Sequence, residues 1–193
     1  MASRDGARAR GTDGRDFGHR ETIASHYQIS AENKRRLKLA IVFHCILTIY
    51  EVTKLSSEIL QLLGIDFKDT YNVILPKSAV WEWIWVMSIF FNLPSLFAIK
   101  KNNVNVMKLF VAGISVCGIL PLIWAILYLF FSGDLRTFFV LGTASSEVEK
   151  FNGVPLVALT TSFVALGFIT HILSIMYARN LIHAWTPKKG KKA

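Results

Sequence analysis

Leu109 to Phe131 reads LFVAGISVCGILPLIWAILYLFF, a run of 23 residues without one charged side chain. At about 1.5 Å per residue, a helix of this length crosses a hydrocarbon layer of about 30 Å. A helix that is apolar on every side at this length is typical of a membrane span. Pro121, in the middle of the run, is expected to bend this helix without ending it. The stretch predicts a transmembrane helix, and the other apolar runs are interpreted as its neighbours.

The first of the other runs opens at Leu39 and stays free of charge to Tyr50. Twelve residues are too few to cross a bilayer, so the predicted span extends through charged positions to Leu63. Gly64 is then expected to end the helix, because glycine readily adopts the left-handed conformation of a helix C-terminus. Before this run, Ser30 is expected to cap the start of the helix.

Two more runs complete the set. The run over 81–99 opens with three tryptophans, which is typical of an aromatic belt at a membrane interface. Asn92 and Pro94 interrupt it, and we interpret them as a packed kink, with a substrate site as the alternative. The last run begins at Val154, and its small residues four apart favour close helix packing. These small residues are Ala158 with Ser162, and Thr161 with Ala165.

The predicted fold is an all-α membrane protein with four transmembrane helices. The helices are expected at 38–63, 81–99, 109–131 and 154–178, joined by segments 64–80, 100–108 and 132–153 and flanked by tails 1–37 and 179–193. Of the 22 Lys and Arg residues, nine precede residue 39, three lie in 100–108 and five follow residue 178. Because basic residues concentrate on the cytosolic side, both termini and segment 100–108 are expected in the cytosol, and the two longer loops in the lumen.

The net charge of +9 comes from clusters that flank the spans. This placement favours contact with anionic lipid head groups and argues against nucleic-acid binding. Residues 1–29 are rich in Gly, Arg and Asp, a composition typical of a disordered cytosolic tail. The sequence carries no phosphate-binding loop, no nucleophile elbow and no zinc-ligand spacing. We therefore expect no enzyme and no cofactor or metal.

Four ionisable side chains fall inside the predicted spans: His44, Glu51, Lys54 and His171. Glu51 and Lys54 lie three residues apart on one helix face, so we predict an ion pair, with Lys54 reaching the lumenal surface as the alternative. His44 and His171 are expected at one depth, which predicts that the first and last helices are neighbours. Separate partners on other helices are the alternative, and two histidines alone are too few for a zinc site.

The C-terminus reads Lys188-Lys189-Gly190-Lys191-Lys192-Ala193. Lys189 and Lys191 lie fifth and third from the end, the Lys-x-Lys-x-x spacing that the coatomer coat reads on cytosolic tails of endoplasmic reticulum proteins. We predict that these two lysines form a retrieval signal. A plain basic collar is the alternative interpretation.

The N-terminal block of this sequence resembles the opening of the Jagunal family. The residues that carry the resemblance are Gly11, Thr12, Asp13, Gly14, Asp16 and Phe17, then His26, Tyr27 and Gln28. Further matches include His44, Lys54, the Trp81-Glu82-x-x-Trp85 block, residues 119–122 and His171, so the similarity touches all four predicted spans.

The resemblance implies a four-span protein of the endoplasmic reticulum membrane that associates with coatomer. It also implies a role in organising this membrane and in vesicle-mediated transport early in secretion. The N-terminal block then becomes a candidate partner-binding motif, in place of a disordered tail over residues 11–30, although its partner is not identified. The alternatives from other classes are a small transporter or channel, and a protein that shapes membranes passively.

Overall fold

The computed structural model describes residues 14–65, 76–141 and 149–186. The helices and strands in these ranges are α1 (Gly14–Leu62), α3 (Val80–Val86), α4 (Ile89–Lys101), α5 (Val104–Gly113), the π-helix η1 (Ile114–Ile119), α6 (Leu120–Phe131), α7 (Asp134–Leu141), β1 (Lys150–Phe151), β2 (Val154–Pro155) and α8 (Leu156–Trp185). Four helical stretches are long and apolar enough to cross a bilayer: Tyr27–Leu62, Val80–Lys101, Val104–Phe131 and Leu156–Trp185. The predicted all-α fold with four spans is confirmed.

Helix α1 is much longer than the span that the sequence predicted. Its 49 residues extend roughly 70 Å, more than twice the hydrocarbon thickness. The expected helix start at Ser30 is wrong, and so is a disordered tail over residues 14–29, because α1 already begins at Gly14. Ser30 lies inside the helix, where its hydroxyl accepts a hydrogen bond of 3.1 Å from Trp185 Nε1 of α8. Tertiary contact with α8 therefore supports helix beyond the apolar run.

The other end of α1 follows the prediction. Gly64 adopts a positive φ of 79°, the conformation expected of a glycine that closes a helix. The Ile65 amide donates to the Leu60 carbonyl at 2.9 Å, and the Gly64 amide donates to Gln61 at 3.0 Å. This pair of bonds is the Schellman arrangement, which satisfies carbonyls left over at the last turn.

The second and third spans are both irregular. Between α3 and α4 the amides of residues 87, 88, 90 and 91 bond to carbonyls three residues earlier, so the helix tightens around Ser88. The predicted interruption therefore lies just before Asn92, and Pro94 is inside α4. In the third span, Pro121 lies at the start of α6, directly after the π-helix η1. A proline removes one backbone donor, and the wider π turn absorbs this loss without ending the span.

The segment after α6, expected as a loop, contains two ordered pieces. Gly133, with φ 83°, leads into the short helix α7. Strands β1 and β2 form an antiparallel hairpin whose turn residues, Asn152 and Gly153, both have positive φ. Two-residue Asn-Gly turns favour this hairpin geometry.

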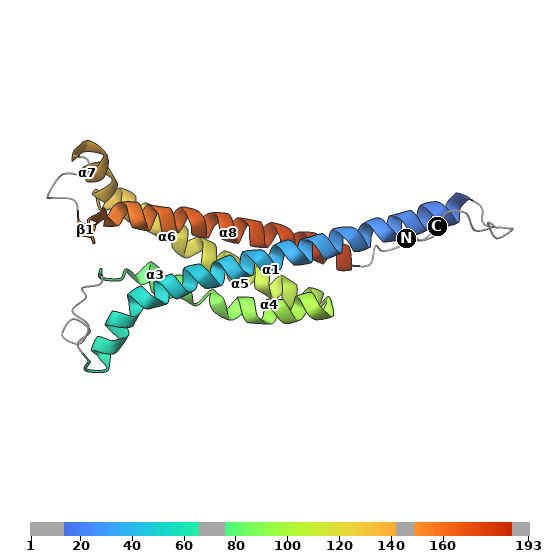
Figure 1. Cartoon of the computed structure of the whole chain (residues 1–193), viewed down its shortest axis with the longest axis horizontal. Helices are drawn as coiled ribbons and strands as arrows, with labels where there is room; N and C mark the ends of the chain where they lie inside the picture. The colour runs from blue at the N-terminus through green and yellow to red at the C-terminus, as the bar shows by residue number, and fades with distance from the viewer. Residues whose placement is uncertain (1–13, 66–75, 142–148, 187–193) are drawn as a thin grey trace.

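Helices α1 and α8 lie side by side along the bundle (Figure 1). Two groups of buried side chains form the interior, one around Leu37, Phe110 and Leu181 and the other around Trp85 and Leu122. The predicted packing of small residues is wrong, because Thr161, Ser162 and Ala165 are exposed on α8. Other small residues of α8 are buried, and a Cβ at Gly167 would approach Leu122 Cδ1 at 3.0 Å.

The N-terminal part of α1, the C-terminal end of α8 and the α4–α5 connection lie at one end of the bundle, and α7 lies at the other (Figure 1). The first end carries most basic residues of the described spans: Lys34, Arg35, Arg36, Lys38, Lys100, Lys101, Lys108 and Arg179. The charge asymmetry seen in the sequence is thus an asymmetry in space.

Candidate functional site

Two histidines meet in the interior of the bundle. The rings of His44 in α1 and His171 in α8 lie edge to face, with their centroids 4.7 Å apart. His44 is 1% exposed and His171 is fully buried. The prediction that the first and last helices are neighbours, with these histidines facing inward, is confirmed.

His44 also bonds to the second span. Its Nε2 lies 2.9 Å from Ser88 Oγ, and its Nδ1 contacts the side-chain amide nitrogen of Asn92. Because the Asn92 amide nitrogen is a donor, His44 Nδ1 is the acceptor of that hydrogen bond. His44 Nε2 then carries the ring proton and donates a hydrogen bond to Ser88 Oγ. Both ring nitrogens of neutral His44 therefore have partners in the second span, Ser88 between α3 and α4 and Asn92 in α4. Separate partners on another helix, the stated alternative, exist together with the contact between the histidines.

His171 is fixed by Trp85 of α3. The Trp85 indole N–H donates to His171 Nε2 at 3.0 Å, so this nitrogen is unprotonated and the neutral ring carries its proton on Nδ1. Among the described residues, Nδ1 has no hydrogen-bond partner. Trp85 also packs edge-on against the His44 ring, with centroids 5.0 Å apart. Three aromatic rings from three spans thus form one buried cluster.

The third span reaches this cluster through a glycine. A Cβ on Gly118, in η1, would lie 2.9 Å from His171 Nε2. Only a residue without a side chain lets the backbone of η1 approach the imidazole this closely. The cluster of His44, Trp85, Ser88, Asn92 and His171, closed by Gly118, therefore joins all four spans, and we call it the histidine cluster.

A second polar group lies between α1 and α3. Lys54 Nζ contacts both carboxylate oxygens of Glu82 at 2.7 Å, and both side chains are largely buried. The predicted pair of Lys54 with Glu51 is wrong, because Glu82, on the facing helix, takes the ammonium group. The stated alternative, a Lys54 that reaches the surface, is also wrong. Glu51 is itself buried, with Oε1 unpartnered among the described residues.

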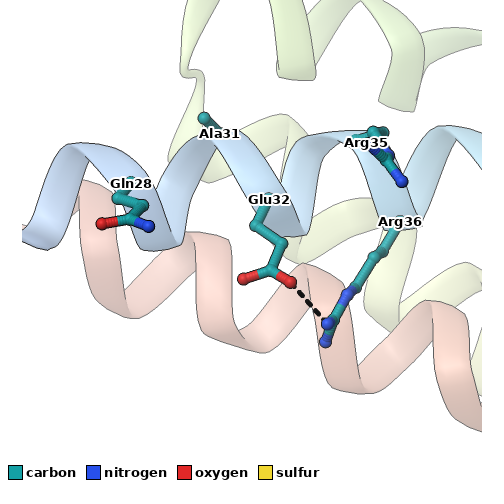
Figure 2. A pocket seen from close by; sticks show the side chains of 5 residues that line it. All are labelled: Gln28, Ala31, Glu32, Arg35 and Arg36. Atoms are coloured by element: carbon teal, nitrogen blue, oxygen red, sulfur yellow. Dashed lines mark hydrogen bonds and ion pairs between the residues drawn. The ribbon is translucent and has the colours of Figure 1, made fainter.

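The basic end of α1 carries an open pocket of about 500 Å³, lined by Gln28, Ala31, Glu32, Arg35 and Arg36. In Figure 2, Glu32 and Arg36 point toward one another and form an ion pair, while Arg35 points away from them. Gln28, from the predicted partner-binding motif, lies one turn before Glu32. Tyr27 of the same motif is exposed.

The remaining predicted site residues divide into two groups. Gly14, Asp16, Phe17 and His26 lie on α1, which makes that part of the motif helical. Gly11, Thr12 and Asp13, together with Lys189 and Lys191, lie outside the described residues. In the described ranges no three His, Cys, Asp or Glu side chains are arranged to hold a metal ion.

The comparisons with known proteins cover the whole chain. Residues 1–189 match the family described as "Jagunal, ER re-organisation during oogenesis". The chain belongs to the Jagunal family. It is 33% identical to protein jagunal of Drosophila melanogaster, over 100% of this chain and 98% of that protein. It is 31% identical to protein jagunal homolog 1 of Homo sapiens, over 100% of this chain and 98% of the relative.

The structure of this Jagunal chain adds four residues that sequence reasoning did not assign to a site. No sequence pattern predicted a site role for Ser88, Glu82 or Gly118. Trp85 was predicted to be part of an aromatic belt. One signal was available in the block Trp81-Glu82-x-x-Trp85, whose glutamate stands among apolar residues. No sequence signal marked Gly118, because glycine is common in membrane-spanning helices.

Proposed function

We propose that this Jagunal chain is a non-enzymatic, multi-pass protein of the endoplasmic reticulum membrane that supports the organisation of this membrane and vesicle-mediated transport early in secretion. The match to the family over residues 1–189 carries the proposal, because the family is described by reorganisation of the endoplasmic reticulum. Four helices long enough to cross a bilayer support the membrane assignment. The basic end of the bundle supports a cytosolic location of both termini.

Two partners belong to this proposal. The coatomer coat would bind the C-terminal tail through Lys189 and Lys191, and anionic lipid head groups would contact the basic end of the bundle. In support of the second, Arg35, Arg36 and Lys38 are exposed on α1 next to the apolar part of that helix. Each basic residue near an anionic surface contributes about 1 kcal/mol to attraction.

The test is loss and restoration of the gene in a secretory cell. Cells without the chain should show a rearranged endoplasmic reticulum in live imaging and slower release of a pulse-labelled secretory protein. The wild-type chain should restore both. If cells without the chain are normal in both measurements, the proposal is wrong. If the membrane is rearranged but release is not delayed, the proposed role in transport is wrong.

A small transporter or channel is the competing function, and the polar histidine cluster is the observation that favours it. Polar groups deep in a bundle often mark a transport path. Here, however, Ser88, Asn92 and both histidines are buried against one another, with exposures of 2% or less. Purified protein in liposomes should therefore pass no ions above the background of protein-free vesicles. Liposomes that become tubular with purified protein alone would instead favour passive membrane shaping.

A further inference from the structure

The buried carboxyl group of Glu51 has an unusual environment. The residue is 2% exposed, and among the described residues no N–H or O–H group donates to Oε1. An ionised carboxylate held in a membrane bundle without donors is costly, by several kcal/mol or more in a low-dielectric interior. The ammonium of Lys54 binds both oxygens of Glu82, so it offsets only part of this cost.

The neighbour of Glu51 is a second carboxyl group. Glu51 shares a face of α1 with Lys54, three residues further on, and Lys54 binds Glu82 of α3. With both carboxyl groups ionised, two negative charges would lie around one ammonium group in the interior of the bundle, which is unfavourable. One of the two carboxyl groups therefore carries a proton. Glu82 accepts two charge-assisted bonds of 2.7 Å from Lys54, which stabilise its ionised form. The proton therefore belongs on Glu51.

We propose that Glu51, Glu82 and Lys54 form a proton-binding site between α1 and α3, with the proton on Glu51 at neutral pH. With this proton, the single negative charge of Glu82 cancels the positive charge of Lys54, and the buried cluster is neutral. Without it, two carboxylates face one ammonium, and the excess negative charge repels Glu82 across the α1–α3 contact. The site binds a single proton. This proposal is separate from the proposed role in membrane organisation.

The other groups around this site do not supply a second cation. Tyr50 directly precedes Glu51 on α1, and its phenol group is neutral or negative. Glu58, one turn beyond Lys54, accepts a hydrogen bond from the Ser78 backbone amide and adds negative charge. From α8, Phe163 packs against Tyr50 and carries no charge. Among these neighbours, Lys54 is the positively charged one.

Infrared spectroscopy of the purified full-length protein in a detergent without ester groups tests the proposal, because the ester carbonyls of phospholipids absorb in the same region as a protonated acid. A protonated carboxylic acid has a carbonyl stretching band that a carboxylate lacks. The wild type should show this band at neutral pH and lose it as the pH is raised. Glu51→Gln, which keeps the size and donor capacity of the protonated acid, should remove the band. Glu32→Gln, at an exposed ion pair, should leave it unchanged.

Two results would overturn the assignment. Absence of the band from the wild type at neutral pH would mean that both carboxyls are ionised, and a stability that then depended on sodium or potassium would identify a metal cation in place of the proton. A band that persists in Glu51→Gln and disappears in Glu82→Gln would place the proton on Glu82. The wild-type pH titration needs no variant, so it remains decisive if a substitution prevents folding.

Discussion

The His44 ring on α1 meets the His171 ring on α8 at the level where the third span is a π-helix. Their centroids lie 4.7 Å apart, and Gly118 of η1 lies against His171. The π turn and the histidine contact have one physical link. Pro121 weakens the helical hydrogen-bond ladder just where the backbone must come close to an imidazole. The histidine cluster is therefore the point where all four spans depend on one another.

Replacing His44 with Leu should destabilise the bundle. The change leaves the Ser88 hydroxyl and the Asn92 amide buried without their ring partner. A buried polar group that loses its partner costs about 1–3 kcal/mol. Thermal unfolding in detergent micelles should show a lower midpoint for this variant. Phe43→Leu, at an exposed neighbouring position, is the control and should change the midpoint little. Equal midpoints for the two variants would contradict a structural role of the cluster.

Gly118→Ala should also lower the unfolding midpoint. Alanine is the better helix former by up to about 1 kcal/mol, so helix propensity alone predicts stabilisation. The new Cβ would, however, lie 2.9 Å from His171 Nε2, and overpacking of this kind costs about 1–3 kcal/mol. The steric cost should exceed the gain in helix propensity, so the variant should unfold at a lower temperature than the wild type.

The pair Gly118→Ala and His171→Ala separates the two effects. Once the imidazole is removed, the added methyl group should no longer destabilise, so the two substitutions should be non-additive. Additive losses would show that Gly118 matters for another reason. Val116→Ala, at an exposed position of the same π-helix, is the control for changes in η1.

Much of this fold followed from the sequence because length and hydropathy alone define a span. The charge-free run through Pro121 and the end of α1 at Gly64 are local signals, and both predictions hold. The contact of His44 with His171 could also be anticipated, because equal depth in a bilayer restricts which residues can meet. A membrane thus makes some long-range contacts readable from position along the chain.

The ion-pair partner of Lys54 was harder to predict from the sequence. Lys54 had Glu51 on its own helix face and Glu82 in a distant segment, and spacing along one helix could not show which carboxylate lies nearer in space. The start of α1 was equally hidden, because the residues before Ser30 carry no apolar periodicity. The contacts of α1 with Trp185 and Asn180 of α8, at Ser30 and Asn33, were also not visible in the sequence.

Breaking the Lys54–Glu82 pair should be strongly destabilising. Removing one partner of a buried pair leaves the other charge uncompensated, which costs about 3–5 kcal/mol. Lys54→Met should therefore lower the unfolding midpoint far more than Arg36→Met, which breaks an exposed pair worth about 1 kcal/mol or less. Exchanging the charges in Lys54→Glu with Glu82→Lys should recover part of the loss. No recovery in the exchanged variant would mean that position, and not charge pairing, governs this contact.

Lys189 and Lys191 should set where the protein resides, if the proposed retrieval by coatomer is correct. These two lysines have the Lys-x-Lys-x-x spacing that coatomer reads on cytosolic tails. Replacing Lys189 and Lys191 with Ser should release the protein to the Golgi or the cell surface, measured by microscopy of a tagged chain. Replacing Lys188 and Lys192 removes the same charge and should have a much smaller effect. A few residues added after Ala193 should also abolish retrieval, because the spacing is counted from the end while the charge stays the same. If both double variants leave the endoplasmic reticulum to the same extent, the tail acts through charge alone and is a basic collar.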